Sequence, residues 1–321
     1  MLDHLRRLID LELPKLPLTG RPDEVYAPMR YLMGLGGKRF RPMLTLLAAG
    51  MCGADPERFV RVALAVEVFH NFSLMHDDIM DQAPMRRGQP TVHMRWNEPV
   101  AILSGDAMLV KAYELLLEAP PAHLPQVLGA FNRCALGVVE GQQWDMNFEQ
   151  HQSLSEGEYL EMIELKTAVL VAFALQLGAL LPGASDDVQQ EMYEAGRQMG
   201  LGFQLYDDYL DAFGTEGQTG KQVGGDILAG KKTMLWVKTT ALLEGADAEA
   251  FTTHYGNRNG GAESIAVCQK LMQQCGAAEA VKQASIEGYE QGLHLLEGWG
   301  GNEQYRGALI ALATQLMYRQ N

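Results

Sequence analysis

The chain has 321 residues, and 47% of them are hydrophobic, which is enough for a large buried core. Its 26 lysines and arginines stand against 40 aspartates and glutamates, which gives a net charge of −14. This balance disfavours a nucleic-acid binder, because such proteins usually present a basic face. The four cysteines form no C-x-x-C pair, so the sequence indicates neither a zinc site nor a disulfide framework.

The N-terminal segment MLDHLRRLIDLELPKL carries charges throughout and lacks the apolar region of a signal peptide. No window of the sequence holds 18 uninterrupted apolar residues. We therefore expect no membrane span and a cytoplasmic protein.

Helical patterns follow one another along the chain. Apolar residues recur at helical spacing in 23–34, 41–51, 57–80, 99–118, 121–148, 155–180, 185–213, 232–244, 261–275 and 277–296. Runs of β-branched residues with period two are missing, and no proline lies after Pro182. Segments 59–75 and 167–181 are apolar on nearly all sides, which is typical of helices inside a bundle. No linker divides the chain, so we predict an all-α fold, a single large helical bundle over residues 1–321.

Two motifs of the pattern D-D-x-x-D each follow an apolar helical run: Asp77, Asp78 and Asp81, then Asp207, Asp208 and Asp211. Positions i and i+4 share a helix face, so the outer carboxylates of each motif repel one another. Hard divalent cations suit carboxylate oxygens, and Mg²⁺ favours one or two carboxylates together with substrate phosphates. One copy alone could equally be a solvated helix end or a cap. Two copies in apolar surroundings favour a metal site.

Cations recur in short motifs of this acidic chain. The motifs GGKRFRP, RRG, ELKTA and TGKQVGGDILAGKKT supply Lys38, Arg39, Arg41, Arg86, Arg87, Lys166, Lys221, Lys231 and Lys232. Arginine grips phosphate through two parallel hydrogen bonds, and lysine adds a mobile charge. Any one of these cations could be an ordinary surface charge. Together with the aspartates they indicate a substrate that carries several phosphates.

The ordered set GGKRFRP, HNFSLMHDDIMDQAPMRRGQPTVH, GQQWD, KTA, GFQLYDDYLDAFG and TGKQVGGDILAGKKT resembles the trans-isoprenyl diphosphate synthases, of the farnesyl and geranylgeranyl type. The resemblance implies a helical bundle around a deep central cavity. It implies head-to-tail condensation of isopentenyl diphosphate with an allylic diphosphate (dimethylallyl, geranyl or farnesyl diphosphate). About three Mg²⁺ ions, held by the six aspartates of two facing motifs, and a homodimer are further expectations.

Matching the motifs residue by residue assigns roles by analogy. The isopentenyl diphosphate would bind Lys38, Arg41, His70 and Arg87. The allylic diphosphate would bind Arg86, Lys166, Lys221 and Lys231. The predicted catalytic residues beside the allylic C–O bond are Lys166, Thr167 and Gln204, with Gln142 and Asp145 lining the same region. A histidine on an apolar helix is often a core residue, but the place of His70, seven residues before Asp77, matches the family.

The implied reaction is ionisation, condensation and elimination. Cations stabilise the departing diphosphate, and an apolar cavity shields the allylic cation from water. No protein base is evident in the motifs, and the resemblance implies that the released diphosphate takes the proton.

Two residues upstream of the first motif bear on product length. Phe72, five residues before Asp77, lies about 7.5 Å down the helix axis. The resemblance implies that an aromatic at this place blocks long products, so one aromatic beside the small Ser73 implies a C15–C20 product, leaning to geranylgeranyl diphosphate. Phe72 could also be ordinary core packing.

Three other functions compete with this prediction. A type I terpene cyclase shares the bundle but normally lacks the second D-D-x-x-D, the R-R-G pair and G-G-K-R-x-R-P. A non-catalytic synthase subunit usually loses carboxylates, and all six are present here. A phosphohydrolase using His76 and Asp77 as a metal pair would need further histidines at helical spacing, which the sequence does not show.

Overall fold

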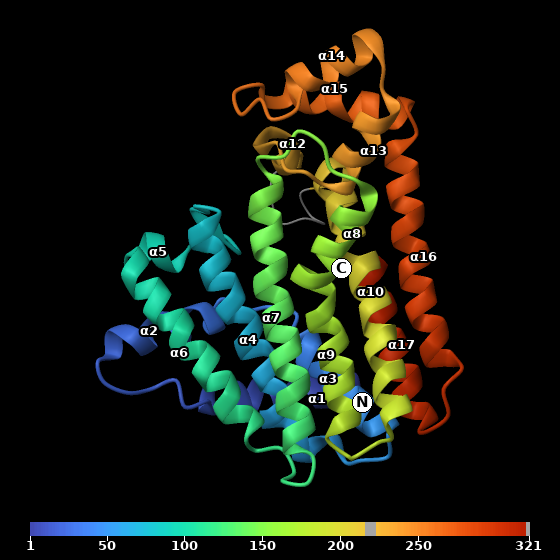
Figure 1. Cartoon of the computed structure of the whole chain (residues 1–321). Helices are drawn as coiled ribbons and strands as arrows, with labels where there is room; N and C mark the ends of the chain where they lie inside the picture. The colour runs from blue at the N-terminus through green and yellow to red at the C-terminus, as the bar shows by residue number, and fades with distance from the viewer. Residues whose placement is uncertain (216–222, 319–321) are drawn as a thin grey trace. The chain divides into compact units, whose positions relative to one another are not determined.

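The protein is almost entirely helical. Its structure is a computed structural model that describes residues 1–215 and 223–318 (Figure 1). Across these residues the only strands are β1 (Met85–Arg86) and β2 (Gln89–Pro90), which pair antiparallel as a short hairpin. The predicted all-α class is confirmed.

The helices follow one another with short connections. Up to residue 148 they are α1 (Leu2–Glu12), η1 (Leu13–Lys15), α2 (Asp23–Gly34), α3 (Phe40–Met51), η2 (Pro56–Phe59), α4 (Val60–Met80), α5 (Val92–Arg95), α6 (Glu98–Leu116) and α7 (Leu124–Phe148). After it come α8 (Glu156–Ile163), η3 (Glu164–Ala168), α9 (Val169–Leu180), α10 (Asp186–Phe213), α12 (Gly225–Ala229), α13 (Met234–Leu242), α14 (Gly245–His254), α15 (Gly261–Gln274), α16 (Ala277–Glu297) and α17 (Glu303–Tyr318).

Each of the ten predicted segments contains a helix, but segment 155–180 is not one regular α-helix. A π-helical turn, η3, separates α8 from α9. Helices α1, α5, α12, α14 and α17 were not predicted. In α14 only Phe251 is buried, so its apolar pattern is weak, whereas α1 buries Leu5 and Ile9 at helical spacing, a pattern that the prediction missed.

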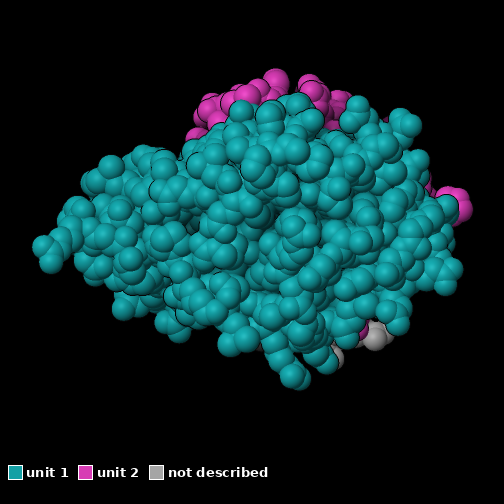
Figure 2. All heavy atoms as spheres, turned by 90° about the horizontal axis from the view of Figure 1, so that it is seen from below, with its two compact units in different colours: residues 1–135, 170–196, 295–312 teal, residues 136–169, 197–294, 313–321 magenta. Residues whose placement is uncertain are grey.

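The chain divides into two compact units, coloured in Figure 2. Unit 1 comprises Met1–Ala135, Leu170–Gly196 and Leu295–Leu312, and unit 2 comprises Leu136–Val169, Arg197–His294 and Ala313–Asn321. The chain alternates between the units, so neither is one continuous stretch of sequence. The single-domain organisation stays a prediction.

In unit 1, α3, α4 and α9 supply much of the core. Ten of the twelve residues of α3 are buried. The Thr45 hydroxyl of α3 donates a hydrogen bond of 2.8 Å to the Ala174 carbonyl of α9. A Cβ atom on Gly178 would lie 2.4 Å from the Thr45 carbonyl oxygen, so only glycine lets the two backbones approach this closely.

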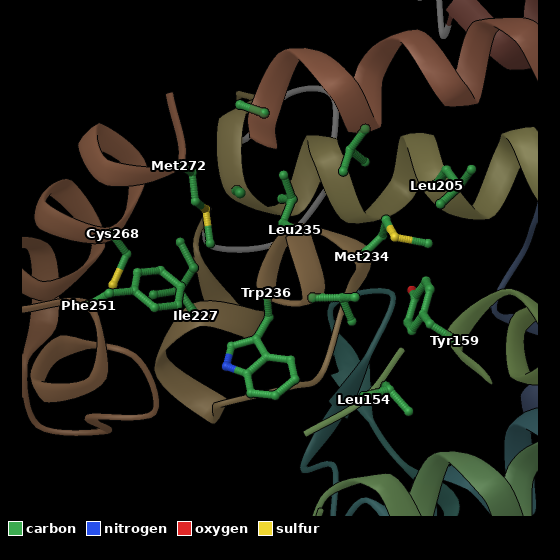
Figure 3. Close-up of a cluster of buried hydrophobic side chains, with 14 of the residues drawn as sticks. Leu154, Tyr159, Leu205, Ile227, Met234, Leu235, Trp236, Phe251, Cys268 and Met272 are labelled. Atoms are coloured by element: carbon green, nitrogen blue, oxygen red, sulfur yellow. The ribbon is translucent and has the colours of Figure 1, made fainter. Parts of the chain in front are cut away.

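In unit 2, a second hydrophobic cluster joins α8, α10, α13, α14 and α15 (Figure 3). The ring of Tyr159 lies among these side chains, and its phenol oxygen is the one polar atom of the side chain. Burying one large apolar side chain contributes about 1.5–3 kcal/mol, so this cluster gives α8, α10 and α13 firm support. These three elements carry the polar groups described below.

One helical run, Glu156–Leu180, is long and apolar enough to cross a membrane by length and composition alone, among the residues the structure describes. Of its most apolar window, 78% is buried inside the protein. The core helix of a globular protein passes the same test, so this run is weak evidence for a membrane span.

Candidate active site

The first acidic motif lies at the C-terminal end of α4 in unit 1. Asp77 and Asp78 lie in its last turn, and Asp81 is its C-terminal cap, whose N–H donates to the Asp77 carbonyl at 2.8 Å. Asp78 is only 1% exposed, and Arg86 Nε donates to both of its carboxylate oxygens at 2.9 Å. Burial raises the pKa of the Asp78 carboxyl, and Arg86 opposes that rise. Asp78 therefore has an arginine partner, and its predicted role as a metal ligand is untested.

The hairpin turn explains why the two consecutive arginines have different partners. Arg86 ends β1, and the next two residues, Arg87 (φ 52°) and Gly88 (φ 73°), form the turn. Positive φ at both central residues is the mark of a tight type I′ hairpin turn. Arg86 pairs with Asp78, whereas Arg87 Nη1 donates to the Gly36 carbonyl.

Arginine side chains surround His70 in unit 1. Burial lowers the pKa of His70 well below its usual value, and the charges of Arg41, Arg87, Arg86 and Arg39 lower it further. The imidazole is therefore neutral at pH 7. Three of the four residues predicted to bind isopentenyl diphosphate thus lie within electrostatic range of one another. The fourth, Lys38, is exposed.

The glycine pair of GGKRFRP makes room for one of these arginines. A Cβ atom on Gly37 (φ 144°) would lie 3.3 Å from Arg87 Nη1. With glycine at 37 the backbone before Lys38 adopts its positive φ and lies close to the guanidinium without crowding it.

A buried ion pair lies beside this cluster. Arg39, in the left-handed conformation (φ 49°), donates to Glu67 at 2.6 Å, and both side chains are at most 6% exposed. Asn71 Nδ2 donates to the Glu67 carbonyl at 2.8 Å. Burial lowers the pKa of both Arg41 and Arg87, and the Glu67 carboxylate opposes that fall. One carboxylate thus supports three of the arginines.

Unit 2 contains a polar cavity of about 140 Å³. It is lined by Asp145, Tyr159, Met162, Ile163, Lys166, Thr167, Gln204, Asp208, Asp226, Lys231, Lys232 and Thr233. All three predicted catalytic residues, Lys166, Thr167 and Gln204, therefore meet at one place. So does Lys231, while Lys221 lies outside the residues that the structure describes.

The π turn η3 presents Lys166 and Thr167 to this cavity. A Cβ atom on Gly141 of α7 would lie 2.2 Å from the Lys166 backbone nitrogen, so α7 packs directly against η3. One turn further along α7, the Asp145 carboxylate forms a short ion pair with Lys166. A π turn inserts one residue into a helix and often marks a functional site.

Four side chains of the cavity form a continuous hydrogen-bond chain. Thr167 Oγ1 donates to Gln204 Oε1 at 3.1 Å, and Gln204 Nε2 donates to Asp208 Oδ1 at 3.0 Å. Tyr159 donates a short hydrogen bond to Asp208 Oδ2. Burial raises the pKa of Asp208 to about 7, and burial together with Asp208 raises that of Tyr159 well above its usual value.

The other two aspartates of the second motif have different surroundings. Asp207 is partly buried in α10. Asp211 Oδ1 accepts from the Asp226 N–H at 2.8 Å, and the Asp211 carbonyl accepts from Gly224 N–H at 2.6 Å. Asp211 thereby ties α12, and with it Asp226 of the cavity, to the end of α10.

Gln142, predicted to line the same region, is only 6% exposed. Neither Nε2 nor Oε1 of its side chain makes a hydrogen bond to any described residue. A buried amide without partners costs free energy, so an unsatisfied amide beside Gly141 indicates a place for a polar ligand or water.

The sequence and the fold both match known proteins. Residues 22–272 match the polyprenyl synthetase family. The chain is 40% identical over 284 residues to a geranylgeranyl diphosphate synthase of Methanosarcina mazei, covering 88% of this chain and 86% of that one. It is 36% identical over 317 residues to a geranylgeranyl pyrophosphate synthase of Geoglobus acetivorans, covering 98% and 97%.

A crystal structure of a geranylgeranyl pyrophosphate synthase superposes with a TM-score of 0.92 at 40% identity, covering 100% of this chain and 99% of that one. The chain belongs to the polyprenyl synthetase family.

The donor atoms of this polyprenyl synthetase fit Mg²⁺ only in part. Within residues 1–215 and 223–318, no three acidic, histidine or cysteine side chains lie close enough to hold an ion by themselves. Asp77 and Asp81, one helical turn apart, suit a cation that completes its shell with water and phosphate. Asp78 and Asp208 already use both carboxylate oxygens in hydrogen bonds. The number of ions stays a prediction.

Phe72, the predicted floor of the product channel, is 8% exposed and packs into a row of aromatic rings in unit 1. Its ring centroid lies 4.9 Å from that of His76 and 5.4 Å from that of Phe69. Phe69 in turn contacts Phe131 of α7 at 5.1 Å. The Ser73 hydroxyl donates to the His70 carbonyl at 2.9 Å.

Several residues of the site were missed from the sequence. Tyr159 and Asp226 line the cavity, and Glu67 balances the arginines of unit 1. Tyr159 carries one usable signal: it lies seven residues before Lys166, a spacing that would put both on one face of a regular α-helix. Glu67 carries one as well, since a carboxylate inside the apolar run 59–75 needs a cation.

We expect Glu67→Gln to lower the free energy of unfolding by about 3–5 kcal/mol, because it leaves Arg39 buried without a counter-charge. The matched control is Glu118→Gln, which breaks an exposed pair with Arg61 whose side chains are 36% and 41% exposed. That change should cost at most about 1 kcal/mol. Urea denaturation of both variants measures the difference, and equal losses would contradict the prediction.

Proposed function

We propose that this polyprenyl synthetase condenses isopentenyl diphosphate with an allylic diphosphate, head to tail. The products are a prenyl diphosphate of C15 to C20, leaning to geranylgeranyl diphosphate, and inorganic diphosphate. The observation that carries the proposal is the cavity of unit 2, where Lys166, Lys231, Thr167 and Gln204 line one space. The names of the relatives, both geranylgeranyl diphosphate synthases, support the same reaction and favour neither a terpene cyclase nor a non-catalytic subunit.

The arginine cluster of unit 1 suits the diphosphate of the acceptor. Burial lowers the pKa of Arg41 to about 10, so its guanidinium is still charged at pH 7. Arg39 and Arg86 have carboxylate partners, whereas Arg87 donates to a neutral carbonyl. An anionic diphosphate beside Arg41 and Arg87 would relieve the repulsion among these cations. The neutral imidazole of His70 can add a hydrogen bond.

The cavity of unit 2 suits the allylic diphosphate. Lys166 and Lys231 offset negative charge as the allylic C–O bond breaks and the diphosphate takes its electron pair. Mg²⁺, when bound, neutralises further charge on that leaving group. The oxygens of Thr167 and Gln204 stabilise the allylic cation. The isopentenyl double bond then attacks the cation, and the released diphosphate accepts the proton that the product loses.

The test is to incubate the protein with Mg²⁺, isopentenyl diphosphate and each allylic primer, and to identify products by mass spectrometry. A linear prenyl diphosphate supports the proposal, whereas a cyclic hydrocarbon, free phosphate or no product contradicts it. Asp77→Ala should lower kcat by about 10²–10³-fold with the helical content unchanged, because stabilisation of the leaving group is lost. Wild-type turnover in that variant would contradict the assignment of Asp77 to Mg²⁺.

Phe72 should limit product length. We expect Phe72→Ala to lengthen the product, because removing the ring opens space along α4. Ser73→Phe should act in the opposite direction and shift the product toward C15. Chain length is read by mass spectrometry of the dephosphorylated products. Products of unchanged chain length in both variants would show that Phe72 only packs the core.

We also propose that α6 pairs with a second copy of the chain. Leu103, Val110 and Leu117 are 57–58% exposed and recur every seven residues, the spacing of paired helices. Val110→Arg should convert the protein to a monomer in light scattering. Leu11→Arg, at an exposed leucine of α1 (63%), is the control and should leave the mass unchanged. A monomeric wild-type protein would contradict the proposal.

A further inference from the structure

We propose that Tyr159 and Asp208 are positioning residues for the allylic cation. In this proposal they fix the side-chain amide of Gln204 so that its carbonyl oxygen, together with the Thr167 hydroxyl oxygen, faces the ionising carbon. Asp208 then acts through Gln204 and not as a direct ligand of Mg²⁺. The inference rests on the proposed function; it adds Tyr159 to the residues already assigned and gives Asp208 a role other than the predicted metal ligand.

The direction of the hydrogen bonds fixes the amide. The Nε2 end of Gln204 donates to Asp208 Oδ1 at 3.0 Å, because only this end of the amide carries donor hydrogens. The Oε1 end then points the other way, where Thr167 Oγ1 donates to it at 3.1 Å. Because the Thr167 proton is used in that bond, the lone pairs of the hydroxyl oxygen remain for the cavity. Two oxygen dipoles, both lining the cavity, thus present negative potential to a developing cation.

Three donors hold Asp208 in place. Tyr159 donates to Oδ2, Gln204 Nε2 donates to Oδ1 at 3.0 Å, and the backbone N–H of Met234 also hydrogen bonds to the carboxyl. The side chain is 4% exposed. A direct bond to a metal ion would displace at least one of these donors and leave it buried without a partner, which costs about 1–3 kcal/mol.

Tyr159 anchors the far end of the chain in the core. It is 2% exposed and belongs to the same hydrophobic cluster as Leu205 and Met234, as Figure 3 shows. Its phenol is held by α8, while Gln204 and Asp208 sit on α10 and Met234 begins α13. Three helices therefore share one hydrogen-bond chain. Movement of any of them would displace the Gln204 carbonyl oxygen.

The experiment compares Tyr159→Phe, Asp208→Asn and the double variant with the wild-type protein. Tyr159→Phe removes the donor. Asp208→Asn keeps the shape, but its amide can no longer accept from both Tyr159 and Gln204, so Gln204 loses its fixed orientation. Tyr113→Phe is the matched control, because it removes a phenol hydrogen bond to Asn132 in unit 1.

We expect each single variant to lower kcat by about 10–100-fold, the effect of misplacing a catalytic group, with KM for the allylic diphosphate unchanged within about twofold. The double variant should lose no more than the worse single variant, because both act through one amide. The Mg²⁺ concentration for half-maximal activity should not change. Calorimetric binding of inorganic diphosphate with Mg²⁺ should also match the wild type.

Three results would overturn the inference. A tenfold rise in the Mg²⁺ requirement of Asp208→Asn, or weakened diphosphate binding, would make Asp208 a metal ligand. Full kcat in Tyr159→Phe would remove Tyr159 from the chain. A loss of kcat together with a rise in KM of similar size and a lower melting temperature would indicate a purely structural role. A wild-type protein that makes no prenyl diphosphate would instead overturn the proposed function and this inference with it.

Discussion

The close approach of Gly141 to the Lys166 backbone is the constraint on which the cavity of unit 2 depends. Any side chain at 141 would overlap that nitrogen, because a Cβ atom would lie 2.2 Å away. The contact puts α7 directly against the π turn. Asp145, one turn along α7, then reaches Lys166, and Thr167 reaches Gln204 of α10 at 3.1 Å. A single glycine thus lets three helices place a cation and two oxygens around one space.

The constraint in unit 1 is different: the positive charges of a buried region need negative charges to balance them. Four arginines act on His70, and two buried carboxylates, Glu67 and Asp78, each hold one of them. The remaining pair, Arg41 and Arg87, leaves an excess of positive charge that a diphosphate would offset. The stability of this region and its affinity for an anion therefore have the same electrostatic origin.

The sequence predicted most of the helices and named most residues of the candidate site, for physical reasons that differ from part to part. The long apolar runs predicted α4 and α9 because burial on all sides needs little besides hydrophobicity. The motif KTA pointed to Lys166 and Thr167, but the π turn that presents them depends on contact with Gly141, far along the chain. The spacing of Tyr159 from Lys166 was a usable signal, but its hydrogen-bond partner could not be assigned for the same reason. Its partner, Asp208, lies 49 residues away and is brought near only by packing.

The two acidic motifs have the same sequence pattern. In both, the middle aspartate has different surroundings from the outer two, which the pattern does not reveal. Successive residues on a helix point about 100° apart, so the middle aspartate of D-D-x-x-D points away from the first, although it lies only three residues before the last. In both copies the middle residue is buried, Asp78 at 1% and Asp208 at 4% exposure, and both of its oxygens accept hydrogen bonds.

Asp78 thereby holds Arg86, and Asp208 holds Gln204. In each case the residue that is held is one predicted to touch the allylic substrate. In both motifs the middle carboxylate is bound to a neighbouring side chain, while the outer two aspartates stay candidate metal ligands. Since a buried carboxylate is costly unless it is fully hydrogen bonded, the middle position tolerates no other arrangement without a loss of stability.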